Sequence, residues 1–423
     1  MTQHENPSPT RRHLLAGSAG AAALAASPVL AAAPALADPS EGPTPDAVTP
    51  RERERRATAA AAALLENFRA ETDPDMLVEQ VPRQDGDPEF TYVWPLSQAR
   101  AAVTELIAAL DGTARPQEPG APDLAAADAA LRRAQENYWY PAGGTTGLPG
   151  YTAATDSAQG ANGDFFYDDN DWIALLEIEQ HLLTDGAQGD LERVGQLLDL
   201  FRSGESTDPD LASPGGIDWT QGDWNHDRNT VSTFPSAKVA LRWYQLTGEE
   251  RALEDALRWM DWGRDALLAP DGLFWDNIKP DGAIDRTHWT YNQGVPLGCE
   301  VLAHAITGED VHRRRALDLV EAVHEHYSPL EESSAFDDQP IQFNAILLSN
   351  LLMAESQLGA QVQGRAVTEA YAQRLWETRR DPETDLVTGS RESGTGTHLL
   401  DQAGFARSLA LASMPRSAWR HLS

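Results

Sequence analysis

The feature that most constrains the fold is a helical hairpin that recurs along the chain. In each copy, an amphipathic helix ends at a short turn that contains threonine, and a second helix follows. The turns are spaced by about 60 residues, a period that predicts an array of helical hairpins. The three clearest copies span 175–201, 240–262 and 301–327, with turns at Thr184-Asp185-Gly186, Thr247-Gly248-Glu249 and Thr307-Gly308-Glu309.

Extending this pattern in both directions predicts twelve helices of two alternating kinds. Six are apolar, as in Ala345-Ile346-Leu347-Leu348, and six are more charged, as in Arg313-Arg314-Arg315. An inner ring buries two faces of each helix and an outer ring buries one, so the alternation predicts an all-α (α/α)6 toroid in one domain, residues 53–423. The inner helices are expected at 96–111, 167–184, 229–247, 290–307, 341–357 and 398–412, and the outer helices at 54–71, 121–138, 188–203, 249–268, 309–328 and 361–379.

The N-terminal residues are typical of an export signal. Residues 1–37 contain the twin arginine Arg11-Arg12, an Ala/Leu/Val-rich stretch and the small-residue cleavage site Ala35-Leu36-Ala37. Pro28 and nearby glycines make that stretch a poor permanent membrane span. We therefore expect a secreted protein with a disordered lead-in at 38–52, which is rich in Pro, Asp, Glu and Thr.

The charge and the cysteine count limit the partners. The formal net charge is -32, and the chain has one cysteine, Cys299. So acidic a surface repels phosphate backbones and anionic lipids, which excludes nucleic acid and membrane surfaces as partners. One interpretation of the acidity is a solvated surface, and a second is adaptation to salt. A monomer without a disulfide or a lipid anchor is expected.

The segments that precede the inner helices predict where the site lies. They are long and rich in Gly, Asp and aromatic residues, whereas the turns at the other helix ends are tight. Loops gathered on one rim commonly carry binding and catalytic residues, and helix N-termini there point free N–H groups and the positive dipole end at the opening. These segments are 139–167, 204–228, 269–289, 329–340 and 380–397.

Polar and aromatic residues stand at the starts of successive inner helices. Any one of them could be a helix cap or a core residue, but together they favour a carbohydrate site, where amides and carboxylates bind hydroxyls and aromatic rings cover C–H faces. The adjacent carboxylates Asp168 and Asp169 are the candidate catalytic pair, and Asp337-Asp338 is the alternative pair. The candidate substrate-binding residues are Tyr167, Asn170, Trp172, Trp219, Asn229, Trp289, Tyr291, Asn292, Gln293, Asp401 and Gln402.

No cofactor or metal is expected. The acidic run from Asp164 to Asp171 lacks the glycine and the distal glutamate of a calcium loop. The chain contains no HExxH or CxxC pattern, and the eleven histidines show no ligand spacing. Gly394-Thr395-Gly396 follows no predicted strand and lacks a third glycine, and a serine nucleophile elbow is missing.

The motifs resemble those of glycoside hydrolase family 76, the endo-α-1,6-mannanases, and in particular its actinobacterial members. The resemblance implies an (α/α)6 fold, no cofactor and retaining cleavage of α-1,6-mannosidic bonds, with Asp168 as nucleophile and Asp169 as general acid/base. Ile173 stands where members often have a second tryptophan. The motifs that carry the resemblance are Tyr167-Asp168-Asp169-Asn170-Asp171-Trp172, Pro214-Gly215-Gly216-Ile217, Asp227-Arg228-Asn229-Thr230-Val231-Ser232, Trp289-Thr290-Tyr291-Asn292-Gln293-Gly294 and Leu399-Leu400-Asp401-Gln402-Ala403.

Two other functions fit a helical toroid. A sugar epimerase or isomerase would use a histidine pair, and only His226 and His288 lie near a predicted rim opening. A non-catalytic glycan-binding protein would keep the aromatic residues but would not need both Asp168 and Asp169. Retaining cleavage needs two carboxyl groups about 5–5.5 Å apart. Their repulsion keeps a proton on one of them, so the pair favours a hydrolase, and the resemblance implies that its substrate is a mannan.

Overall fold

A computed structural model of the chain describes residues 48–111, 121–388 and 396–423. The predicted signal peptide, residues 1–37, lies outside these residues, as do most of the predicted lead-in and Gly394-Thr395. Twelve α-helices are present in the described part. None of them combines the length and the apolar character needed to cross a bilayer.

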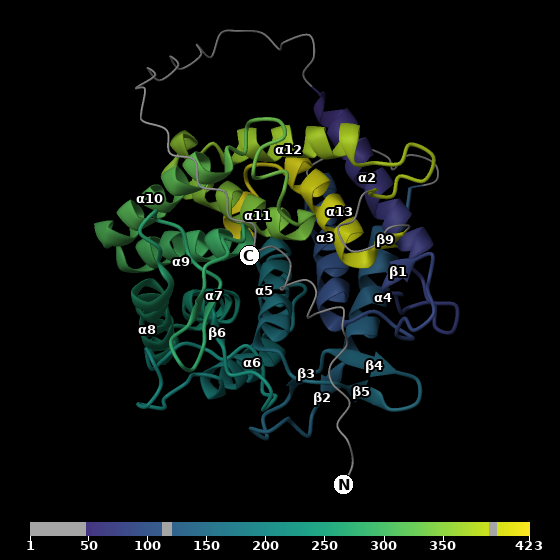
Figure 1. The fold of residues 1–423 in the computed structure, drawn as a ribbon. Helices are drawn as coiled ribbons and strands as arrows, with labels where there is room; N and C mark the ends of the chain where they lie inside the picture. Colours follow the sequence, from purple (N-terminus) through teal and green to yellow (C-terminus); the bar gives the residue numbers. More distant parts are fainter. Residues whose placement is uncertain (1–47, 112–120, 389–395) are drawn as a thin grey trace.

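Six helices form an inner ring (Figure 1). Each packs on the next one, and the last, α13, packs on α3 and closes the ring. The predicted (α/α)6 toroid is therefore confirmed. The inner helices are α3 (Val93–Asp111), α5 (Tyr167–Leu183), α7 (Thr230–Thr247), α9 (Tyr291–Thr307), α11 (Ile341–Leu358) and α13 (Leu399–Ser413).

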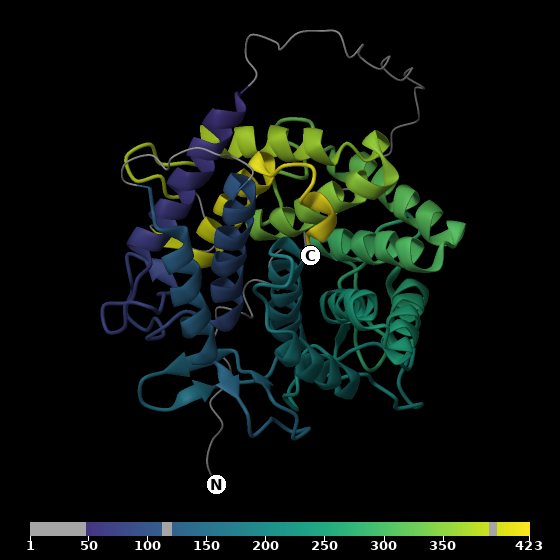
Figure 2. The ribbon, with the colours of Figure 1, turned by 180° about the vertical axis from the view of Figure 1, so that it is seen from behind.

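The other six helices surround this ring, as the view from behind also shows (Figure 2). They bury one face, as α8 does with Ala252, Ala256, Trp259 and Gly263 at helical spacing. The outer helices are α2 (Pro50–Asn67), α4 (Leu124–Glu136), α6 (Leu191–Ser203), α8 (Glu250–Leu267), α10 (Asp310–Tyr327) and α12 (Gly364–Thr378), and two short 3-10 helices are η1 (Ala360–Val362) and η2 (Trp419–His421).

The first helix begins inside the predicted lead-in. Thr49 is its N-cap, with an Oγ1 that accepts from the Glu52 N–H at 3.2 Å, and Pro50 occupies the first helical position. Both are standard start signals, so residues 50–52 are helical rather than part of a disordered segment.

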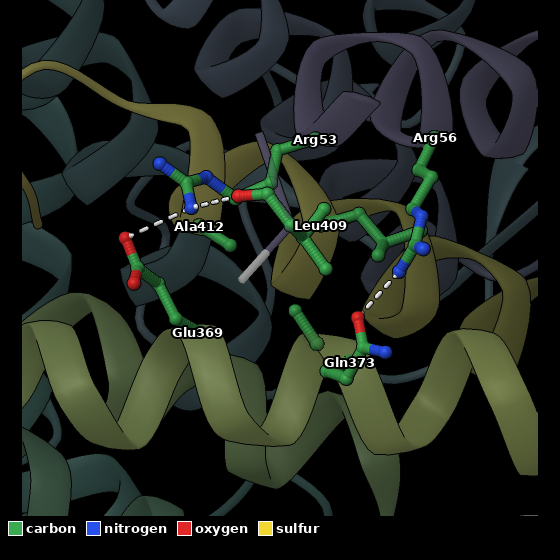
Figure 3. A pocket seen from close by; sticks show the side chains of 8 residues that line it. Arg53, Arg56, Glu369, Gln373, Leu409 and Ala412 are labelled. Carbon is green, nitrogen blue, oxygen red and sulfur yellow. Dashed lines mark hydrogen bonds and ion pairs between the residues drawn. The ribbon is translucent and has the colours of Figure 1, made fainter. Parts of the chain in front are cut away.

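A cleft of about 240 Å³ lies between this helix and α12 on the outside of the toroid, and contacts across the cleft hold the helix in place (Figure 3). Arg53 of α2 donates to the Val48 carbonyl and pairs with Glu369 of α12 at 3.4 Å. Arg56 donates to the Gln373 amide oxygen, again on α12. Because its polar groups are occupied with each other, this cleft joins α2 to α12 and offers no catalytic arrangement.

The tight turns lie at the end of the toroid opposite the long loops. Gly248 and Gly308 follow α7 and α9 with φ of +73° and +71°, the left-handed conformation that a side chain disfavours. Each accordingly ends an inner helix and starts an outer one, as the hairpin pattern predicts.

Short strands, which the sequence did not predict, connect the long loops at the other end. Antiparallel pairs link the loop before α3 to the loop before α13, and the loop before α7 to the loop before α9. A further bridge joins Phe166, ahead of α5, to Thr220, ahead of α7. The strands are β1 (Gln80–Val81), β2 (Trp139–Tyr140), β3 (Gly150–Tyr151), β4 (Ala154–Asp156), β5 (Gly160–Asn162), β6 (Arg228–Asn229), β7 (Asn277–Ile278), β8 (Ile284–Asp285) and β9 (Thr397–His398).

Candidate active site

Asp168 and Asp169 lie in the first turn of α5, on the rim with the long loops. Phe166 precedes them in an extended conformation and provides no side-chain cap. The two side chains are 6% and 1% exposed, so both carboxyl groups are largely withdrawn from water. The positive end of the helix dipole stabilises a carboxylate in this position. Burial favours a proton on one member of such a pair.

Asn170 holds this turn in place and does not face a substrate. Its Oδ1 accepts from the Tyr151 N–H at 2.7 Å, and its Nδ2 donates to the carbonyls of Tyr151 at 3.0 Å and Phe166 at 2.8 Å. The amide thereby fastens β3 to the head of α5. The predicted substrate-binding role of Asn170 is replaced by a structural one.

The same correction applies to Gln293 and Gln402. The Gln293 side chain exchanges two hydrogen bonds with the backbone of Phe274, and that of Gln402 accepts from the Val387 N–H at 2.7 Å and donates to the Ala60 carbonyl at 3.0 Å. At three inner-helix heads, therefore, a buried amide clasps the peptide groups of the preceding loop. These amides fix the loops, since a buried peptide group needs a partner.

Asp171 lies one turn further along α5 and is fully buried. Burial raises the pKa of Asp171 well above its usual range, and the negative charge of Asp168 raises it further. The Ser236 hydroxyl, which donates to Oδ1 of Asp171 at 2.9 Å, lowers that pKa in part. Its Oδ2 has no hydrogen-bond partner among the residues described. Asp171 is therefore a neutral acid beneath Asp168, on the same face of the helix.

A second polar cluster occupies the heads of α7 and α9. The Asp276 carboxylate accepts from Asn292 Nδ2 at 2.9 Å and from Asn277 Nδ2 at 3.0 Å, and its backbone carbonyl accepts from the Thr230 N–H at 2.8 Å. Burial raises the pKa of Asp276 to about 7; the bond from Asn292 lowers it and the Asp285 charge raises it. Asp276 and Asn277 are not among the residues predicted from the sequence. Their signal was an acid and an amide directly after Trp275 in a long rim loop.

Three amide oxygens in this cluster form no hydrogen bond within the described residues. Oδ1 of Asn229, Asn277 and Asn292 are each buried, and within the described parts of the chain none has a hydrogen-bond partner. Asn229 and Asn277 are directly paired across β6 and β7. Buried polar atoms without partners are costly, so hydroxyl donors of a ligand would stabilise this arrangement. The predicted residues Asn229 and Asn292 thus lie together here.

The predicted aromatic residues divide between the core and the rim. Tyr167 is buried and packs against Gly204 at the end of α6, where burial raises its pKa to about 12. Its hydroxyl is hydrogen-bonded to Ser203 and Gln221, and its expected sugar contact stays a prediction. Trp172 is likewise buried in the main core. Tyr291 stacks on Phe343 with ring centroids 3.9 Å apart, and Trp289 meets the same ring edge-on at 5.5 Å.

Trp219 belongs to a separate aromatic group at the rim. It lies 5.0 Å from Phe166 and 5.7 Å from Trp224, measured between ring centroids. Trp224 is 40% exposed, and its Nε1 donates to Asp164 at 2.8 Å. Trp219 is therefore the buried support of an exposed tryptophan, and its neighbour Phe166 lies two residues before Asp168 in the sequence.

An open groove of about 820 Å³ adjoins this aromatic group. Tyr140, 39% exposed, and Trp224 line this groove together with Asn162 and Gln221. Exposed rings beside amides are suited to bind sugar residues.

The remaining predicted acids lie elsewhere on the rim. Asp401 is partly exposed at the head of α13. Asp337, a member of the alternative catalytic pair Asp337-Asp338, forms an ion pair with Arg374 at 2.8 Å, so its role is structural.

The raised pKa of Asp276 leads to a prediction about stability. An unfolded aspartate releases its proton near pH 3.9, whereas Asp276 keeps its proton to about pH 7 in the folded protein. The stability that this group contributes is complete below pH 3.9 and is lost as pH rises to 7, by about 1.4 kcal/mol per pH unit. Relative to the Asp276→Asn variant, the wild type should lose stability from pH 5 to 7 and stay level above that. Urea unfolding at pH 5, 6, 7 and 8 measures this; parallel profiles would contradict the raised pKa.

Comparisons with known proteins place these features in context. The model of glycosyl hydrolase family 76 matches residues 149–404. A family 76 mannosidase of Bacteroides thetaiotaomicron superposes with a TM-score of 0.69 at 18% identity, over 86% of this chain and 98% of that one. An α-1,6-mannanase of Salegentibacter, solved as an inactive variant with two consecutive aspartates changed to asparagine and in complex with α-1,6-mannotriose, gives 0.65 at 18% identity, over 85% and 99%. At these identities the likeness shows the fold.

Curated relatives match over a shorter stretch. A mannan endo-1,6-alpha-mannosidase of Candida glabrata is 29% identical over 110 residues, and the corresponding protein of Saccharomyces cerevisiae is 26% identical over 117 residues. The alignment with the Candida glabrata protein covers 25% of that protein and 24% of this chain. The alignment with the Saccharomyces cerevisiae protein covers 26% of each, so this chain spans about a quarter of the length of either relative.

Proposed function

Because the chain belongs to glycoside hydrolase family 76, we propose that it hydrolyses α-1,6-mannosidic bonds within a mannan, with Asp168 and Asp169 as its catalytic carboxyl groups. The observation that carries this proposal is the pair itself. Two consecutive, buried aspartates occupy the first turn of an inner helix on the rim of an (α/α)6 toroid. The Salegentibacter α-1,6-mannanase likewise has two consecutive aspartates, and the variant in which both are replaced is inactive.

The proposed mechanism is retaining. The carboxylate of Asp168 attacks the anomeric carbon while Asp169 gives its proton to the departing glycosidic oxygen. Asp169 then takes a proton from water, which attacks the glycosyl–enzyme ester and releases Asp168. Since Asp171 is neutral, it adds no negative charge beneath Asp168.

Two features of the rim support binding of a sugar polymer. Asn229, Asn277 and Asn292 have buried amide oxygens at the heads of α7 and α9. Tyr140 and Trp224 border an open groove that Asp164 and Phe165, shortly before Asp168 in sequence, also line. An open groove accepts the middle of a chain, and this favours endo action.

Export through residues 1–37 is also part of the proposal, and cell fractionation would test it. The actinobacterial affinity stays a prediction.

Digestion of a linear α-1,6-mannan tests both the activity and its mode. An endo-acting retaining enzyme should shorten the polymer quickly, release oligosaccharides, and form the α-anomer first in proton NMR. A β-anomer formed first would reject the retaining mechanism, and release of mannose alone would reject endo action. Binding of mannan without any cleavage would show instead a glycan-binding protein on the same toroid.

A further inference from the structure

Three side chains with metal-binding atoms meet outside the candidate active site. Asp271 lies at the start of the loop between α8 and α9, His288 at the end of that loop, and His326 in the last turn of α10. One carboxylate oxygen and one ring nitrogen from each histidine all lie within 4.8 Å of one another. The three positions lie far apart in the sequence, so their spacing gave no indication of a site.

His288 is the central member of this group. Its Nδ1 lies 3.7 Å from the Asp271 carboxylate, and its ring centroid lies 5.3 Å from that of His326. Its other ring nitrogen, Nε2, is buried and has no hydrogen-bond partner in the described segments. A neutral imidazole offers the lone pair of one ring nitrogen to a metal ion. The Tyr327 hydroxyl donates to the His288 carbonyl at 3.1 Å and fixes its backbone.

We propose that Asp271, His288 and His326 bind one divalent transition-metal ion of the Zn²⁺ type. Two imidazoles and a carboxylate suit Zn²⁺, whereas Ca²⁺ and Mg²⁺ prefer oxygen ligands. Ligand bonds of about 2.0–2.2 Å in a tetrahedral site place the ligand atoms roughly 3.3–3.5 Å apart. Asp271 and His326 are exposed, so side-chain rotation can close the present distances, and water completes the fourth position.

The site would stabilise the loop that carries the second polar cluster. Asp271 and His288 are at the two ends of this loop, which holds Asp276 and Asn277 between them. A metal ion would join both ends to α10 and thereby hold the cluster against the heads of α7 and α9. The ion is thus structural, and its binding does not depend on the function proposed above.

Calorimetric titration of EDTA-treated, dialysed full chain with ZnCl2 tests this proposal. We expect one Zn²⁺ per chain and a melting temperature that rises by about 2–4 °C at saturation. His326→Ala and Asp271→Asn alter exposed side chains and should fold, yet each should weaken Zn²⁺ binding at least about tenfold. Co²⁺ in place of Zn²⁺ should give the visible absorption bands of tetrahedral coordination in the wild type and not in these two variants.

His304→Ala is the matched control. His304 is also partly exposed, but its Nδ1 is bonded to the Glu309 carbonyl at 3.0 Å, at the opposite end of α9. This variant should bind Zn²⁺ as the wild type does. The proposal is overturned if the wild type binds no Zn²⁺, or if His326→Ala and Asp271→Asn bind it with unchanged affinity.

Discussion

Replacing Asp168 or Asp169 with asparagine is expected to lower the turnover of linear α-1,6-mannan by about 10³-fold or more. An amide neither forms the glycosyl ester nor donates a proton, while its shape leaves the first turn of α5 in place. Loss of acid/base catalysis alone costs about 10²–10⁴-fold, and loss of the nucleophile removes the double displacement altogether. Reducing-end assays on both variants, with circular dichroism to verify folding, measure this effect.

The two variants should differ on an activated substrate. A mannoside whose leaving group departs without protonation does not need the acid for the first step. Asp169→Asn should therefore cleave it and accumulate the ester, whereas Asp168→Asn should stay inactive. The reverse pattern would exchange the two roles.

Asp338→Asn is the matched control, because Asp338 also belongs to an Asp-Asp pair on the rim and is exposed. Its turnover should equal that of the wild type. Wild-type turnover in either the Asp168 or the Asp169 variant would disprove the proposed catalytic pair.

The helices could be predicted from the sequence because each inner helix and each outer helix buries a different share of its surface. The predicted bounds agree with the structure to within a few residues at most ends, as for 290–307 and Tyr291–Thr307. The short strands could not be predicted in this way. Each has only two or three residues, too few for an alternating pattern, and their pairing depends on how the toroid brings the loops together.

The site residues show a different limit. The sequence predicts Asn170, Gln293 and Gln402 as sugar ligands because an amide binds hydroxyls, but an amide binds peptide groups equally well. Only the position of the loop backbone decides between the two. Asp276 was missed for a related reason: its partner Asn292 is on the next inner helix, and Asn229 reaches the cluster from another one.

Replacing Glu105 with alanine is expected to lower the free energy of unfolding by about 3–5 kcal/mol, since it leaves a buried arginine without its counter-charge. Glu105 of α3 and Arg407 of α13 are almost completely buried where these helices close the ring. Arg407 donates to both carboxylate oxygens, at 2.5 Å and 3.1 Å, and to Gln98 at 2.6 Å. Urea unfolding followed by tryptophan fluorescence measures the loss.

Two further variants separate charge burial from a general effect of losing an ion pair. The exposed pair Asp75–Arg133 is also short, at 2.7 Å, yet Asp75→Ala should cost less than about 1 kcal/mol, because water already solvates both groups. Glu105→Leu combined with Arg407→Met removes both buried charges, so it should regain much of the stability that Glu105→Ala loses. If the double variant is as unstable as the single one, packing at the α3–α13 contact, rather than the unpaired charge, determines the stability of ring closure.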